Sequence, residues 1–231
     1  ADMASDLNNA SLDYTQVTIE SPFSSEHDKM TGTKGSFEKT VAGIDKLLSL
    51  KMQVVTNTTL TKINYRSFPE LLRFGHDLGL TNMACNTIIC SGKGILAKDE
   101  MGLSSGEINE VLTLANERAK ELKINLQWYS PTCYHDVNPI LLGFGVKACS
   151  AAAYNMTVQP NGTVLPCQSW PEEVGNLLTD KWEDIWNNPI CTNLRNGFHN
   201  SDEKCHACEF SRLCLGACPL ETKSCEKGGV N

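Results

Sequence analysis

The sequence predicts an α/β protein with two parts. A parallel sheet covered by helices is expected in residues 1–130, and a cysteine-rich, loop-rich domain in residues 131–231. Strand and helix patterns alternate along the first part, as parallel βαβ units require. From about Pro131 the helical periodicity weakens, and Cys, Gly, Pro and Asn become more frequent. We therefore place the domain boundary near residue 130.

Each element is predicted from its own local pattern. Strands are expected where polar and apolar residues alternate or β-branched residues gather. Helices are expected where apolar residues recur at helical spacing behind a capping residue. The predicted strands are 15–20, 53–59, 82–89 and 124–129, and the predicted helices are 36–50, 67–78 and 104–122. In the second part, Asn161-Gly162 favours a hairpin between residues 154–158 and 163–165, and residues 182–186 fit a short amphipathic helix.

Composition excludes some classes of function. The chain has 231 residues, a hydrophobic content of 41% and a formal net charge of -7. An acidic chain is a poor partner for nucleic acid, whose phosphates attract basic surfaces. Residues 1–20 do not form a signal peptide and no apolar run is long enough to span a membrane, so we expect a cytoplasmic protein with reduced cysteines. A signal peptide removed before Ala1 stays an alternative.

Seven cysteines at fixed spacing dominate the last third of the chain. Cys149 is followed after twelve residues by Gly162, and Cys167 follows after four more. The others are Cys205-x2-Cys208-x5-Cys214-x3-Cys218 and a final Cys225. Iron–sulfur clusters and structural zinc both prefer thiolates presented by short turns, so spacing alone leaves both metals open.

This spacing resembles the seven-cysteine signature of the SPASM domain, a C-terminal extension of many radical S-adenosylmethionine (radical SAM) enzymes. Residues 159–167, Gly175-Asn176 and 182–186 fit the same domain. The resemblance implies two auxiliary [4Fe–4S] clusters with interleaved ligands. It assigns Cys149, Cys167 and Cys218 to the first cluster, and Cys205, Cys208, Cys214 and Cys225 to the second.

The first of these ligand sets is one thiolate short. In the family the fourth ligand comes from upstream, and Cys133 is the nearest candidate, although it lies sixteen residues before Cys149. An open coordination position that takes substrate or water is the alternative. The remaining cysteines, Cys85, Cys90 and Cys191, are interpreted as small buried hydrophobic residues.

Residues 14–130 resemble the second half of the radical SAM barrel, a partial (β/α)6 relative of the eight-fold barrel. The resemblance rests on residues 16–20, 27–32, 35–38, 57–64 and 88–94, in that order. Parallel barrels place chemistry at the carboxyl ends of their strands, so Thr18, Glu20 and Asn57 would face S-adenosylmethionine. The alternative is that these three are strand-end residues bonded to neighbouring loops. His27 and Asp28 are interpreted as loop-structuring residues.

One family motif is missing from the sequence. Radical SAM enzymes hold their S-adenosylmethionine-cleaving [4Fe–4S] cluster with Cys-x3-Cys-x2-Cys, and these 231 residues contain no such spacing. We therefore expect an N-terminally truncated chain that is inactive alone. The third cluster and S-adenosylmethionine would belong to the full-length parent.

The resemblance implies an enzyme that abstracts hydrogen through a 5′-deoxyadenosyl radical. Relatives of this kind commonly modify peptides or proteins, and some act on porphyrins. A peptide or protein substrate and an electron donor such as ferredoxin or flavodoxin are the implied partners, with no nucleic acid and no membrane. Two other hypotheses stay open: a non-catalytic iron–sulfur electron-transfer or binding module, and a structural zinc protein.

Overall fold

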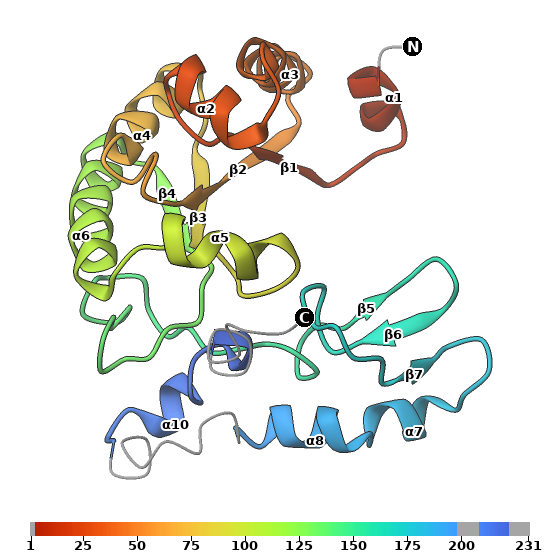
Figure 1. The fold of residues 1–231 in the computed structure, drawn as a ribbon. Helices are drawn as coiled ribbons and strands as arrows, with labels where there is room; N and C mark the ends of the chain where they lie inside the picture. The colour runs from red at the N-terminus through yellow and green to blue at the C-terminus, as the bar shows by residue number, and fades with distance from the viewer. Residues whose placement is uncertain (1–2, 198–207, 222–231) are drawn as a thin grey trace. The chain divides into compact units, whose positions relative to one another are not determined.

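The computed structural model describes residues 3–197 and 208–221, which form two compact units (Figure 1). The first unit comprises the residues up to Ile88 together with 100–130 and 142–144. The second comprises 89–99, 131–141 and the described residues from Gly145 onward. Segment 89–99 thus groups with the cysteine-rich part of the chain, although it precedes residue 130.

The first unit is built on the predicted parallel sheet. Its strands are β1 (Tyr14–Thr18), β2 (Gln53–Leu60), β3 (Asn82–Thr87) and β4 (Asn125–Trp128), hydrogen-bonded in that order. All the pairs are parallel, so the carboxyl ends of the strands meet at one edge. The register places Thr18 opposite Asn57, and Thr59 opposite Asn86.

Helices cover one face of this sheet. The helices of the first unit are α1 (Met3–Asn9), α2 (Ser24–Thr31), α3 (Ser36–Ser49), α4 (Phe68–Asp77) and α6 (Ser105–Leu122), whereas most of α5 (Lys93–Met101) belongs to the segment grouped with the second unit. Figure 1 shows α3, α4 and α6 along the same side of the strands. Side chains of β2 alternate between buried and half-buried, so Thr56 and Thr58 lie under the helices while Asn57 and Thr59 lie on the opposite face. That opposite face is available for a functional site.

A capping box explains where α6 begins, whereas α3 and α4 begin without a side-chain cap. Ser104 and Glu107 form a reciprocal capping box at the start of α6, which satisfies backbone donors that the helix leaves unpaired. The Lys62 ammonium and the Ser104 groups together lower the pKa of Glu107 to about 2. Glu107 therefore stays ionised and joins α6 to the turn after β2.

Helix α2 corrects the interpretation of residues 27–28 as a loop. Both residues lie within α2, where His27 is buried and its Nδ1 accepts a hydrogen bond from the Glu20 backbone amide. The Asp28 carboxylate accepts from the Gly35 and Phe37 amides and thereby fixes the turn that leads into α3. The structuring role was correctly inferred, but the residues act from a helix.

The second unit contains short elements around a small core. Strands β5 (Thr157–Val158), β6 (Thr163–Leu165) and β7 (Gly175–Asn176) form an antiparallel sheet, which confirms the hairpin predicted at Asn161-Gly162. The helices are α7 (Trp182–Trp186), α8 (Pro189–Arg195) and α10 (Ser211–Cys214). Their core, which we call the small core, consists of Ala151, Ala152, Val164, Trp170, Val174, Ile185, Cys191, Leu194 and Leu220.

Arg195 ties the loops of this unit to its helices. Its guanidinium lies 4.1 Å from the centre of the Trp186 ring and donates to the Trp186 and Ala152 carbonyl oxygens. These contacts connect α8, α7 and the segment that follows Cys149. Within residues 3–197 and 208–221, no helix has the length and apolar character needed to cross a membrane.

Candidate functional site

Three cysteines gather on the small core. Cys149, Cys167 and Cys218 are each half-buried and packed against it, and we call them the core thiols. Burial raises the pKa of Cys149, and the neighbouring Cys167 raises it further. Burial, together with Cys149 and Cys167, raises the pKa of Cys218 to about 11. The structure thus brings together the ligands that the resemblance assigns to one cluster.

Two further cysteines lie at α10, and we call them the α10 thiols. The carbonyl oxygen of Cys208 accepts from the Ser211 amide at 3.1 Å, which places Cys208 at the start of this helix. Cys214 is the last residue of α10 and is buried. The other two cysteines assigned to the second cluster, Cys205 and Cys225, lie outside the described residues.

Cys133 lies beside the α10 thiols. Its carbonyl oxygen accepts from the amides of Asp136 and Val137, forming a turn. The next residue, Tyr134, packs its ring 6.1 Å from that of Phe210, the residue that precedes α10. Burial raises the pKa of Cys133, and the neighbouring Asp136 and Cys214 add to the increase.

The remaining cysteines are buried, as expected. Cys85 and Cys191 are fully buried free thiols, and burial raises the pKa of both. Cys90 is also buried, but it is disulfide-bonded rather than free, which corrects its interpretation as a simple hydrophobic residue. The next residue, Ser91, donates a hydrogen bond of 2.6 Å to the Ser169 carbonyl oxygen, so this segment is attached to the turn after Cys167.

The core thiols are chemically suitable ligands for an iron–sulfur cluster. Half-buried thiols on an apolar support are the soft ligands that such clusters require. Among the described residues, no group of three or more His, Cys, Asp or Glu side chains is already spaced to hold a single metal ion. Soft thiolate ligands of this kind suit an iron–sulfur cluster and a zinc ion alike.

The uncovered face of the sheet is polar near the carboxyl ends of its strands. Asn57 Nδ2 donates to Asn86 Oδ1 at 2.8 Å, and Asn86 Nδ2 donates to the Thr87 carbonyl oxygen at 2.8 Å. The buried Asn57 Oδ1 accepts no hydrogen bond from any described residue. An unpaired buried acceptor is unfavourable and indicates a missing donor, such as a hydroxyl or ammonium group of a ligand.

Thr18 and Glu20 belong to the same face but differ in their surroundings. Thr18 is exposed at the end of β1. Glu20 Oε2 accepts from the Thr59 amide at 2.8 Å, and burial raises the Glu20 pKa to about 7. The structure thus places Thr18, Glu20 and Asn57 along one edge of the sheet. The hydrogen bond from Thr59 also gives Glu20 a role in the fold.

The raised pKa of Glu20 predicts a pH-dependent stability. Because the pKa is about 7 in the folded chain and 4.5 as a free side chain, its stabilising contribution is complete below pH 4.5. That contribution is lost as the pH rises through 7, and the loss amounts to about 3 kcal/mol. Glu20→Gln is expected to remove this loss. Between pH 5 and 8, the free energy of unfolding measured in urea should therefore rise for the variant relative to the wild type.

Glu117→Gln, which replaces an exposed carboxylate of α6, is the matched control and should follow the wild type across this range. A Glu20→Gln curve parallel to the wild-type curve would show that Glu20 ionises freely in the folded chain.

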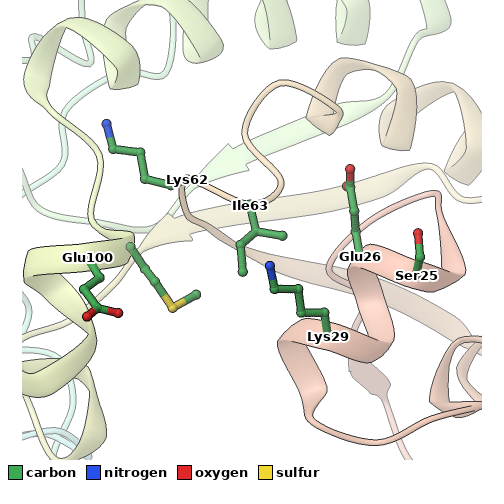
Figure 2. A pocket seen from close by; sticks show the side chains of 7 residues that line it. Ser25, Glu26, Lys29, Lys62, Ile63 and Glu100 are labelled. Atoms are coloured by element: carbon green, nitrogen blue, oxygen red, sulfur yellow. The ribbon is translucent and has the colours of Figure 1, made fainter.

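A pocket of about 640 Å³ lies at the carboxyl-end side of β2 (Figure 2). It is lined by Ser25, Glu26, Lys29, Lys62, Ile63, Glu100 and Met101. In Figure 2 the Lys29 ammonium points toward Ile63, while Glu26 points up from α2. Glu26 Oε2 accepts from the Ser21 and Ser67 hydroxyls at 2.6 and 2.7 Å. Sequence analysis missed this pocket because its residues come from three distant segments that share no motif.

Comparison with known proteins finds a family match within the second unit. A family model for the SPASM iron–sulfur cluster-binding domain matches residues 149–209. The match begins at the first of the core thiols and includes Cys208. The SPASM domain that cysteine spacing predicts is therefore confirmed over this range.

Two relatives extend the similarity along the chain. An AdoMet-dependent heme synthase of Methanosarcina barkeri is 25% identical over 224 residues, which cover 91% of this chain and 63% of the relative. A PqqA peptide cyclase of Rhizobium meliloti is 23% identical over 219 residues, which cover 92% of this chain and 56% of the relative. The chain thus spans about three fifths of the length of these relatives.

The fold agrees with these similarities. The solved structure of native anSMEcpe with bound AdoMet superposes with a TM-score of 0.71 at 15% identity, covering 98% of this chain and 63% of that one. Identity this low establishes the fold alone. Together, the family match and the superposition confirm the predicted α/β fold and the resemblance to radical SAM/SPASM proteins.

Proposed function

We propose that this chain, which has the fold of the radical SAM/SPASM proteins and carries their iron–sulfur domain, serves a radical enzyme as the holder of two auxiliary clusters. The observation that carries the proposal is the grouping of Cys149, Cys167 and Cys218 on the small core. Cys149 and Cys167 lie inside the range 149–209 that the SPASM family matches, and Cys218 follows that range. The α10 thiols supply the described part of a second ligand set.

Each unit has a distinct task in this proposal. The second unit holds clusters that relay electrons or bind substrate, and its small core keeps the core thiols together. The first unit would bind S-adenosylmethionine along its uncovered face, where Asn57 offers an unpaired acceptor and Thr18 is exposed. When bound beside a third cluster, this cofactor supplies the radical that abstracts hydrogen from substrate.

A peptide or protein is the substrate class that we propose. The PqqA peptide cyclase acts on a peptide by its name, and it aligns with 92% of this chain. A ferredoxin or flavodoxin would deliver the electrons. Porphyrins are the second candidate class, because the heme synthase of Methanosarcina barkeri has the higher identity of the two relatives.

Anaerobic reconstitution tests the cluster proposal. We expect about eight iron and eight sulfide per chain, the content of two four-iron clusters, with cluster absorbance and a reducible paramagnetic signal. Stoichiometric zinc without cluster absorbance after anaerobic purification would support the structural zinc hypothesis instead. The chain contains no Cys-x3-Cys-x2-Cys, so 5′-deoxyadenosine formed by this chain alone would contradict the proposed division of tasks.

The two substrate classes are separated by direct binding. Reconstituted chain is titrated with a carboxylated free-base porphyrin and, separately, with a library of short peptides, using porphyrin absorbance and peptide fluorescence anisotropy. Saturable one-to-one porphyrin binding with no peptide binding would favour the second candidate. Peptide binding that depends on cluster loading would favour the first.

A further inference from the structure

The pocket at the carboxyl end of β2 is built from three segments that hydrogen bonds join. All seven of its lining residues belong to the first unit. The Lys62 amide donates to the Met101 carbonyl oxygen at 2.9 Å, which joins the turn after β2 to the end of α5. The Glu26 carboxylate accepts from the Ser67 hydroxyl at 2.7 Å, which joins α2 to the start of α4. The walls of the pocket are therefore fixed without a ligand.

The turn that carries Ile63 into the pocket is fixed by Asn64, which is buried. Asn64 Oδ1 accepts from the Thr61 amide at 2.8 Å. Its Nδ2 donates to the carbonyl oxygens of Thr59 and Glu20 at 3.0 and 2.7 Å. The turn is thus attached to Glu20, at the edge of the sheet where we place S-adenosylmethionine. A ligand in the pocket would lie beside that edge.

Two of the four charged side chains in the lining already have partners. The Lys62 ammonium pairs with Glu107, and one oxygen of Glu26 accepts from two serine hydroxyls. The other two, Lys29 and Glu100, are exposed, and neither has a hydrogen-bond or ion-pair partner within the part of the chain that the structure describes. The pocket therefore offers one unpaired positive charge and one unpaired negative charge.

These two charges flank an apolar surface. In Figure 2, Lys29 and Glu100 enter from opposite sides, and the Lys29 ammonium points toward Ile63. Ile63 and Met101 are half-buried. The volume of about 640 Å³ lies within the range of about 300–1,000 Å³ that is usual for ligand pockets. This lining suits a ligand that carries apolar groups between charges of opposite sign.

A short peptide with one acidic and one basic side chain has this composition. A carboxylated porphyrin carries charge of one sign only, so it would pair with Lys29 and leave Glu100 facing a like charge. The charge pattern of the pocket thus favours the first of the two substrate classes proposed above.

Resting on the proposed function, we propose that this pocket is a docking site for the peptide substrate, in which Lys29 pairs with an acidic side chain of the peptide and Glu100 with a basic one. Ile63 and Met101 contact the apolar residues between these charges. Ion pairs at an exposed site add modest affinity, but they select peptides whose charges match and repel those whose charges do not. The docking site would therefore select among peptides.

Charge exchange tests the pairing. The probes are fluorescein-labelled hexapeptides with one Asp and one Lys separated by one, two or three Leu, and a matched neutral set has Asn and Gln in place of the charges. Anisotropy is measured with the reconstituted 231-residue chain. We expect saturable binding of a charged probe, about tenfold weaker binding in Lys29→Glu and in Glu100→Lys, and recovery in the double variant, where the peptide binds in the reverse direction.

Lys39→Glu, which reverses an exposed charge of α3 outside the pocket, is the control and should bind the charged probe as the wild type does. Equal binding of charged and neutral probes, or no binding of any probe, would overturn the proposal. Iron content is measured first. A chain that takes up no iron refutes the proposed function, whereas a chain with two clusters whose peptide binding ignores Lys29 and Glu100 refutes the docking site alone.

Carbon-13 labelling of the methionine methyl groups locates the bound peptide. In the oxidised, reconstituted chain, the Met101 methyl resonance should shift as the charged probe saturates, and Met101→Leu assigns that resonance. The resonances of Met52 and Met83, which are buried elsewhere in the first unit, should stay unchanged. An unchanged Met101 resonance in a chain that binds the probe would place the peptide outside the pocket and overturn the proposal.

Discussion

Removing iron from the reconstituted chain is expected to lower its unfolding temperature by more than about 10 °C. The second unit has little regular structure to hold it otherwise, since its strands span two or three residues and α10 spans four. Ligation at Cys149, Cys167 and Cys218 would join three loops across the small core. Small metal-binding units obtain much of their folding free energy from such ligation, of the order of 10 kcal/mol in peptide systems.

The raised thiol pKa values support this dependence. Cys218, with a pKa of about 11, is protonated at neutral pH when no metal is present, so the apo form avoids gathering negative charge. Neutral thiols make no bond to one another and contribute only modest packing. The stabilisation that the cysteines offer is therefore realised only when a metal displaces their protons.

Anaerobic circular dichroism and calorimetry, with and without a strong iron chelator, measure the effect. Cys191→Ala is the control, because it removes a fully buried thiol from the small core without removing a proposed ligand. Cooperative unfolding at the same temperature with and without iron would show that the small core alone stabilises this unit.

The sheet and the longer helices could be predicted because their local signals agree with their packing. The alternation in β2 places Val54 and Leu60 under the helices, and the pair Ser104 and Glu107 marks the start of α6. The bounds differ from the predicted ones by only a few residues. Where pattern, cap and burial indicate the same element, sequence reasoning is reliable.

Helix α2 shows where the local signal is too weak. Its eight residues contain no apolar stripe, and its buried residue is His27, which is polar. The helix is held by contacts with distant segments, namely the Glu20 amide on His27 and the turn organised by Asp28. Only the tertiary structure brings these partners together, so periodicity could not find the helix.

The resemblance predicted the grouping of Cys149, Cys167 and Cys218, which the structure brings together, but not the surroundings of Cys133. Spacing identified the cysteines, and the family match confirms their domain. The resemblance places the fourth ligand of the first cluster upstream of Cys149, and Cys133 is the nearest candidate in the sequence. The contact between Tyr134 and Phe210, which lie far apart in the sequence, shows different surroundings for Cys133. The sequence also does not show which face of β2 is covered by helices, because Thr56 and Thr58 make the face opposite Asn57 polar as well.

Gly162 explains why the hairpin between Cys149 and Cys167 requires a glycine. Its φ is +86°, a conformation that residues with a side chain rarely adopt. A Cβ atom there would lie 2.5 Å from Asn176 Oδ1 and 2.6 Å from Leu178 Cγ. The Asn176 side chain cannot move freely, because it accepts from the Leu178 amide at 2.9 Å and donates to the Asn161 carbonyl oxygen at 3.1 Å.

Gly162→Ala is therefore expected to destabilise the second unit by about 2–4 kcal/mol, combining backbone strain with overpacking. Gly145→Ala separates these two causes, because Gly145 has a φ of +73° but open space around its Cβ position. That control should lose only about 1 kcal/mol, the conformational part. Denaturant unfolding of both reconstituted variants measures the difference, and iron content reports whether the hairpin still presents Cys149 and Cys167 together. Equal losses of unfolding free energy in the two variants would mean that the hairpin rearranges to accommodate the added methyl group. In that case, the contacts of Asn176 do not fix the shape of the hairpin.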